Sequence, residues 1–155
     1  MAAPNLYRVH PYLRTIARNL PRVASKYGFQ VRITSGYRSK QTQARLYNDY
    51  ISGRSQYPAS PPGMSAHNFG MALDIISTNT EALVNMLTQA GLQWAGPKDP
   101  IHFQLPGKIA SRTRVVRKVQ RVKGGARAFV DKVLDYTSWI PGPIGWTSMI
   151  ADIFI

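Results

Sequence analysis

Apolar residues follow two different periods along the first two-thirds of the chain. Near the N-terminus they recur at helical spacing, at Leu13, Ile16, Ala17, Leu20, Val23, Ala24 and Tyr27. This spacing predicts one helix, or two shorter helices with Pro21 in the first turn of the second, because proline cannot donate the hydrogen bond of a helix interior. Residues 29–34 alternate strictly between apolar and polar, which predicts a half-buried strand.

The next stretch predicts two more helices separated by a loop. Ser39 is a suitable N-cap for a helix that continues to about Ile51. We expect its buried side to consist of Leu46, Tyr47, Tyr50 and Ile51. Residues 52–63 are rich in Ser, Pro and Gly and predict a loop, and residues 78–81 form a capping-box pattern before another helix that Gly91 ends.

Two further strands carry polar residues at chosen positions. In residues 71–76, side chains two apart share a face, so Asp74 lies on the face opposite Leu73 and Ile75. In residues 101–105 the same alternation places His102 opposite Phe103. Mixed strands and helices with chemistry on the loops predict an α+β domain.

Three of these polar residues suit a metal ion. A catalytic zinc site has three protein ligands and leaves a fourth position for water. His67, Asp74 and His102 meet this requirement, and Asp99 remains as a candidate general base. Each residue taken singly also has an ordinary structural explanation: a hydrogen-bonded or surface role for the three ligands, and a turn cap before Pro100 for Asp99.

These residues stand in motifs that resemble a known family. Residues 65–74 read Ser-x-His-x6-Asp, residues 99–104 read Asp-x-x-His-Phe-Gln, and residues 34–39 read Thr-Ser-Gly-Tyr-Arg-Ser. Together they resemble the zinc D-alanyl-D-alanine carboxypeptidases and L-alanyl-D-glutamate endopeptidases, which share their fold with the Hedgehog signalling domain. The resemblance covers roughly residues 6–105 and implies a small antiparallel sheet with packed helices.

The resemblance also implies a role for each residue. His67, Asp74 and His102 would bind Zn2+, and Asp99 would be the general base. Arg38 would stabilise the oxyanion or the scissile carbonyl, although it could instead pair with a surface carboxylate. Ser65 would help to bind substrate, although it could simply cap a turn.

The implied activity is hydrolysis of a peptidoglycan stem peptide by a zinc metallopeptidase. Many members of the family have Glu at the position of Asp99, and the Asp form is similar to the phage endolysin-like endopeptidases. We therefore expect cleavage of the L-Ala-D-Glu bond rather than D-Ala-D-Ala carboxypeptidase activity. The alternative is a virion structural or membrane- or genome-binding protein that carries a peptidase-like, non-catalytic module.

Composition divides the chain into two regions. We expect a peptidase domain in residues 1–105 and a basic, then hydrophobic, extension in residues 106–155. Of the 20 Lys and Arg residues, which exceed the acidic residues by 13, eight lie in residues 108–127 without any acidic residue. Such a surplus favours anionic wall polymers, membrane surfaces or virion proteins as partners of the extension. Specific nucleic-acid binding is not expected, since no aromatic residue interrupts the basic run to stack on bases.

The extension ends in an almost wholly apolar stretch, residues 146–155. It fits a packed helix or subunit contact, or an interfacial anchor, better than a membrane span, which needs about 20 apolar residues. The N-terminal residues contain no continuous apolar segment, so a signal peptide is not expected. The expected location is therefore a phage virion, or a host cytoplasm from which the enzyme reaches the wall at entry or lysis. The absence of cysteine excludes disulfides.

Overall fold

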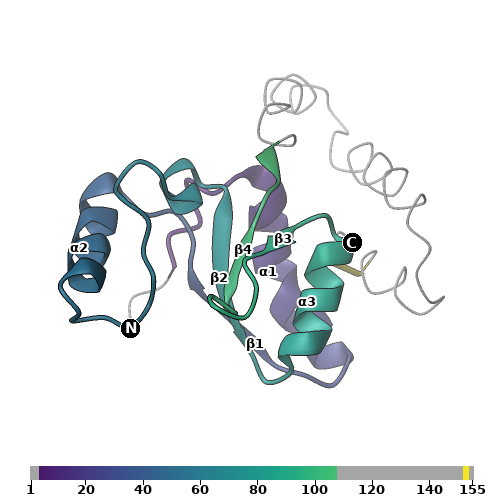
Figure 1. The fold of residues 1–155 in the computed structure, drawn as a ribbon. Helices are drawn as coiled ribbons and strands as arrows, with labels where there is room; N and C mark the ends of the chain where they lie inside the picture. Colours follow the sequence, from purple (N-terminus) through teal and green to yellow (C-terminus); the bar gives the residue numbers. More distant parts are fainter. Residues whose placement is uncertain (1–3, 108–151, 154–155) are drawn as a thin grey trace, which may run out of the picture.

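The fold is built on one small antiparallel sheet. The computed structural model describes residues 4–107 and 152–153. Its strands are β1 (Val31–Ser35), β2 (Ala72–Ser77), β3 (Gln93–Trp94) and β4 (His102–Gln104), in the spatial order β1-β2-β4-β3 (Figure 1). All three neighbouring pairs are antiparallel. The predicted α+β class with a small antiparallel sheet is confirmed.

Two helices cover one face of this sheet and enclose the core. They are α1 (Pro11–Lys26) and α3 (Thr80–Gln89). Buried side chains from both helices and from the sheet pack together, among them Leu13, Ile16, Leu20, Leu83, Met86, Leu87, Leu73, Ile75 and Phe103. Of the two predicted alternatives the single helix is correct, because Pro21 lies on the exposed side of α1 and leaves its apolar side undisturbed.

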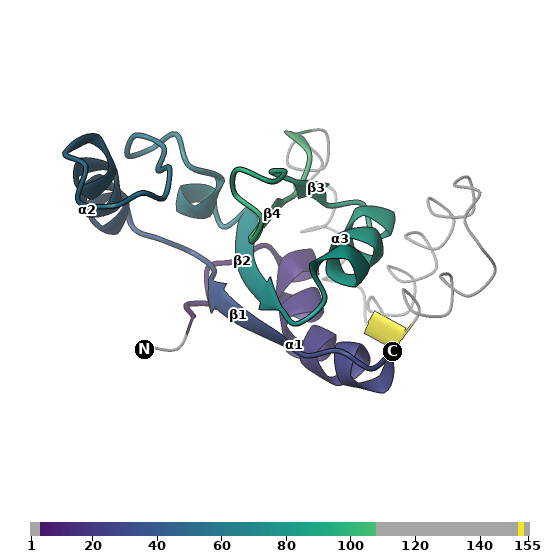
Figure 2. The same cartoon turned by 60° about the horizontal axis from the view of Figure 1, so that its bottom comes forward.

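The third helix, α2 (Lys40–Ile51), differs from its prediction in what it buries. Ser39 caps it as predicted, since the Ser39 hydroxyl accepts a hydrogen bond from the Thr42 amide at 3.1 Å. The predicted buried side is wrong: Gln43 is the buried residue of α2, whereas Tyr50 is 40% and Ile51 60% exposed. Figures 1 and 2 show the reason, because α2 lies apart from α1 and α3 at the other end of the molecule. Helical spacing identifies a shared side but not a neighbour to cover it.

The described residues near the C-terminus pack against α1 (Figure 2). Ile153 is fully buried in the core, and its carbonyl accepts a hydrogen bond from the Asn19 amide at 2.7 Å. The Asp152 carboxylate lies 2.5 Å from the Lys26 ammonium and 2.9 Å from the Tyr27 hydroxyl. The basic run at 108–127 lies outside the described residues, as does the terminal apolar stretch apart from these two residues. Within the described residues, no helix is long and apolar enough to cross a membrane.

Candidate metal centre

The three predicted ligands come from three elements on the same side of the sheet. His67 lies in a short 3-10 helix, η1 (Ala66–Phe69), which sequence patterns did not predict. Asp74 lies in β2 directly opposite His102 of β4. Because side chains alternate across a strand, Asp74 and His102 point away from the core that Leu73 and Phe103 fill. The predicted alternation is correct in both strands.

A tight turn after η1 brings His67 to the strands. Gly70 has φ +68°, a left-handed conformation that side chains rarely adopt. A Cβ atom at this position would collide with the carbonyl oxygen of Arg8. Glycine therefore serves both purposes expected of it, the positive φ and the close approach of another backbone segment.

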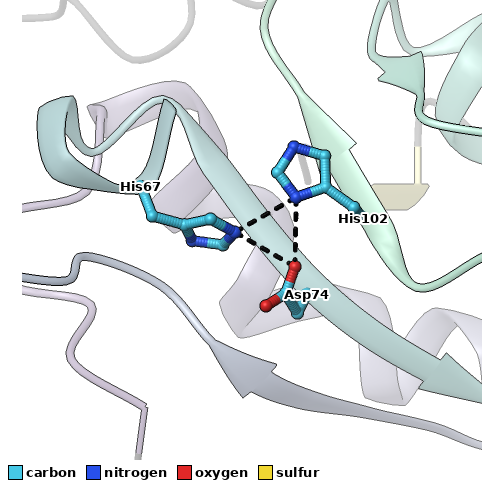
Figure 3. A group of neighbouring side chains, drawn as sticks. All are labelled: His67, Asp74 and His102. Carbon is cyan, nitrogen blue, oxygen red and sulfur yellow. Dashed lines mark hydrogen bonds and ion pairs between the residues drawn. The ribbon is translucent and has the colours of Figure 1, made fainter. Parts of the chain in front are cut away.

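The ligand atoms form a nearly equilateral triangle (Figure 3). His67 Nε2 lies 3.0 Å from Asp74 Oδ1 and 3.2 Å from His102 Nδ1. His102 Nδ1 lies 3.2 Å from the same Asp74 oxygen. All three side chains are buried or half-buried. The structure therefore brings the predicted set together at one point.

Hydrogen bonds on the outer side of each imidazole determine which nitrogen faces the triangle with a lone pair. His67 Nδ1 lies 2.6 Å from the carbonyl oxygen of Gly36, which can only accept, so His67 donates there. His102 Nε2 lies 3.2 Å from Gln104 Oε1 and donates in the same way. The two inner nitrogens then present lone pairs to each other and to a carboxylate. Three acceptors without a proton between them repel one another unless a cation lies among them.

A zinc ion fits this donor set. Tetrahedral ligands with zinc bonds of about 2.0–2.1 Å lie about 3.3 Å apart, close to the edges of the observed triangle. Two imidazoles and one carboxylate are a ligand combination used by catalytic zinc peptidases, and outer hydrogen bonds to each histidine are typical of such sites.

Arg38 lies at the edge of the triangle. Its Nη2 is 3.1 Å from His67 Nε2 and forms an ion pair with the second oxygen of Asp74. Its Nε donates to the Ser35 hydroxyl at 2.8 Å. Arg38 is thus held within the site rather than on an outer surface.

The electrostatics favour an ionised Asp74. Burial alone raises its pKa, but hydrogen bonds with His102 and His67, together with the charges of His67 and Arg38, leave the pKa well below the ordinary value. For His102, burial lowers the pKa, but the hydrogen bond and the negative charge of Asp74 raise it overall. Asp74 is therefore a carboxylate ligand at neutral pH.

Asp99 and Ser65 line the cleft that leads to the triangle. The cleft has a volume of about 660 Å3, and its lining also includes His67, His102 and Trp94. Burial raises the pKa of Asp99. Ser65 is buried, and its hydroxyl caps η1 by accepting from the His67 amide at 3.3 Å. The turn-cap alternative for Ser65 is therefore correct, and the same residue also reaches the cleft.

Gln43 belongs to the site but was not predicted. It is 1% exposed, its Oε1 lies 3.4 Å from Arg38 Nη1, and its Nε2 donates to the Ser60 carbonyl at 2.8 Å. It connects Arg38 to the loop that forms one side of the cleft, since Ser60 lines that cleft. A polar residue on the side of α2 that faces inwards is the signal that could have revealed it.

Comparison with known proteins agrees with this geometry. A family model described as VanY, D-alanyl-D-alanine carboxypeptidase, matches residues 7–99, which is more than half of the chain. The chain belongs to this family. The expected family and the expected enzyme class, a zinc metallopeptidase, are thereby confirmed, and the His-Asp-His cluster supplies a site for the metal.

Solved structures show the same fold. The LdcB LD-carboxypeptidase is 22% identical with a TM-score of 0.52, and the match covers 67% of this chain and 69% of that chain. DacB from Streptococcus pneumoniae D39 is 22% identical with a TM-score of 0.52, covering 68% of this VanY-family chain and 70% of the other. A zinc complex of a vancomycin-resistance VanY variant is 17% identical with a TM-score of 0.47, covering 63% and 72%.

Proposed function

We propose that this VanY-family chain is a zinc-dependent peptidase that cleaves the stem peptide of peptidoglycan, with the L-Ala-D-Glu bond as its target. One observation carries the proposal: three unprotonated ligand atoms converge within 3.2 Å of one another on the lining of a 660 Å3 cleft. Family membership supports the substrate class.

The ligands are assigned to His67, Asp74 and His102. Bound zinc supplies positive charge that polarises a carbonyl and lowers the pKa of water towards about 7. The protein residues keep the three donors in place before the metal arrives, through the Gly36 carbonyl, Gln104 and Arg38. Such preorganisation is what a tight metal site requires.

Asp99 is assigned the proton transfers. It accepts a proton from the water whose oxygen forms the new bond to the peptide carbonyl carbon. It then gives this proton to the amine nitrogen as the C–N bond breaks, so the carboxylate is regenerated. A raised pKa suits a group that must both accept and release a proton near neutrality.

Arg38 and Ser65 are assigned to the substrate. The guanidinium of Arg38 provides fixed positive charge beside the triangle, where negative charge develops on the carbonyl oxygen. The Ser65 hydroxyl accepts from the His67 amide and can still donate its own proton to a substrate carbonyl in the cleft.

Two features support an endopeptidase rather than a carboxypeptidase. Asp99-x-x-His102-Phe103 resembles the phage endolysin-like branch. A cleft of 660 Å3 also has room for several residues of a stem peptide, more than a terminal D-Ala-D-Ala requires. The test is mass spectrometry of fragments released from defined peptidoglycan. A new amino-terminal D-Glu supports the proposal, whereas free D-Ala as the sole product contradicts it.

The biological setting proposed is a phage lysis or virion-associated enzyme whose residues 106–155 bring it to the wall, membrane or particle. Deleting this region is a poor test, because Ile153 belongs to the core. Replacing the eight basic residues of 108–127 by Gln keeps Ile153. Unchanged hydrolysis of soluble stem peptides with weaker binding to anionic wall preparations supports the proposal, and unchanged binding contradicts it.

A further inference from the structure

The loop between β3 and β4, residues 95–101, carries Asp99 but leaves its side chain unsupported. Among residues 4–107 and 152–153, none donates a hydrogen bond to the Asp99 carboxylate. A side chain without such partners takes its position from its backbone. The location of the Asp99 oxygens in the cleft therefore depends on how firmly this loop is held.

Backbone hydrogen bonds hold the two ends of the loop. The Ala95 amide donates to the His102 carbonyl at 3.0 Å, and the Ile75 amide of β2 donates to the Ile101 carbonyl at 2.8 Å. Within the loop, the Asp99 amide donates to Gly96 at 3.1 Å. These bonds fix the ends and the turn, but they leave the Pro100 carbonyl, next to Asp99, without a backbone partner among the described residues.

The indole of Trp94 supplies that partner. Trp94 Nε1 donates to the Pro100 carbonyl oxygen at 2.9 Å. Pro100 has no amide hydrogen, so its carbonyl is its one hydrogen-bonding group. Trp94 itself is well anchored, because it pairs with Phe103 in the sheet and its ring packs against the core. The indole thus ties the loop to a rigid part of the fold at the residue that follows Asp99.

We propose that Trp94 is a positioning residue for Asp99, acting through the Pro100 carbonyl. This inference rests on the proton-transfer role given to Asp99 above. The other function open to Trp94 is simply to form part of the cleft wall. The two functions use different parts of the side chain, since the wall needs the ring and the latch needs the N–H.

Trp94→Phe separates them, because phenylalanine keeps an aromatic ring and lacks the N–H. We expect kcat on a soluble stem peptide to fall about tenfold, since small misplacements of a reacting group cost up to about 100-fold. KM should stay within about twofold and zinc content should be unchanged, because neither ligands nor wall are lost. Trp94→Leu, which also removes the ring, should raise KM in addition.

A double-mutant cycle tests whether the effect passes through Asp99. In an Asp99→Asn background, Trp94→Phe should cause no further loss of kcat, because there is no carboxylate left to position. Tyr12→Phe is the matched control, since it removes another side-chain donor to a backbone carbonyl, that of Ala90, outside the cleft. It should lower the melting temperature and leave kcat unchanged.

Each result decides between separate claims. Unchanged kcat in Trp94→Phe, or an equal fold-loss in both backgrounds, overturns the positioning role while the proposed function stands. Full activity of Asp99→Asn itself instead removes Asp99 from the mechanism, and the proposed function loses its base.

Discussion

Asp74 and His102 face each other across two antiparallel strands, and their side chains meet at 3.2 Å on the side of the sheet away from the core. A directly opposed pair of this kind is among the closest side-chain arrangements that a sheet offers. His67 completes the set from a separate turn, so two ligands are placed by the sheet and one by a loop.

Zinc removal should abolish activity reversibly. We expect about one zinc per chain by elemental analysis, and loss of hydrolysis with a strong chelator that added zinc restores. His102→Ala should lose both metal and activity. His10→Asn alters the one histidine outside the site and should keep both. Equal zinc content in the two variants would exclude His102 as a ligand.

Asp99→Asn should retain zinc and lose turnover. The change removes the proton acceptor without altering size, and we expect kcat to fall by about 100- to 10,000-fold. Asp49→Asn is the control, because Asp49 pairs with Arg54 on α2. Activity on purified stem peptide and zinc content should be measured together. A similar loss in both variants would point to a general effect of charge.

Gln104→Leu should weaken zinc binding rather than abolish it. Gln104 accepts the hydrogen bond from His102 Nε2, and loss of such an outer partner typically costs about 10- to 100-fold in metal affinity. Competition with a chromogenic chelator measures this. Gln93→Leu removes only the distant partner of Gln104, 3.4 Å from its Nε2, and should have a smaller effect. The reverse order would contradict the assigned tautomer of His102.

His10 should make stability depend on pH. Burial, followed by the charge of Arg14, lowers its pKa, so the unfolded chain takes up a proton at a higher pH than the folded protein does. The free energy of unfolding should therefore fall as the pH drops below about 6.5. His10→Asn keeps an N-cap acceptor for α1 and removes this titration. Denaturant unfolding of the zinc-loaded proteins from pH 7.5 to 5 should show a shallower dependence in the variant, and identical slopes would refute the assignment.

Ile153→Ala should destabilise the protein although the residue is far from the core in sequence. Truncating a fully buried isoleucine typically costs about 2–5 kcal/mol. Ile51→Ala on α2 is the matched control, because that side chain is 60% exposed, and surface changes usually stay within about 0.5 kcal/mol. Denaturant unfolding of both variants provides the comparison. Equal free energies of unfolding would show that Ile153 does not contribute to the core in solution.

Local patterns predicted much of the site correctly. Alternation in the two strands placed Asp74 and His102 opposite the core, and the Ser39 cap and the Gly91 stop gave the starts and ends of α2 and α3 closely. Each of these depends on neighbours in sequence, which a single chain reveals.

Features that depend on distant neighbours were missed. The two-residue strand β3 has too few positions to show a period, and η1 is too short for a helical one. Burial on α2 was misassigned because spacing cannot show that no element lies against Tyr50 and Ile51. Gln43 escaped notice because its partners, Arg38 and the Ser60 carbonyl, come together only in the folded chain.

The packing of Ile153 against the helix formed by residues 11–26 has a consequence for biosynthesis. That helix leaves the ribosome early, but a side chain that it encloses is translated more than a hundred residues later. The nascent domain can assemble its sheet and helices sooner, yet its interior remains unfinished until that late segment emerges. The mature stability of this hydrolase is therefore reached only after translation has passed residue 153.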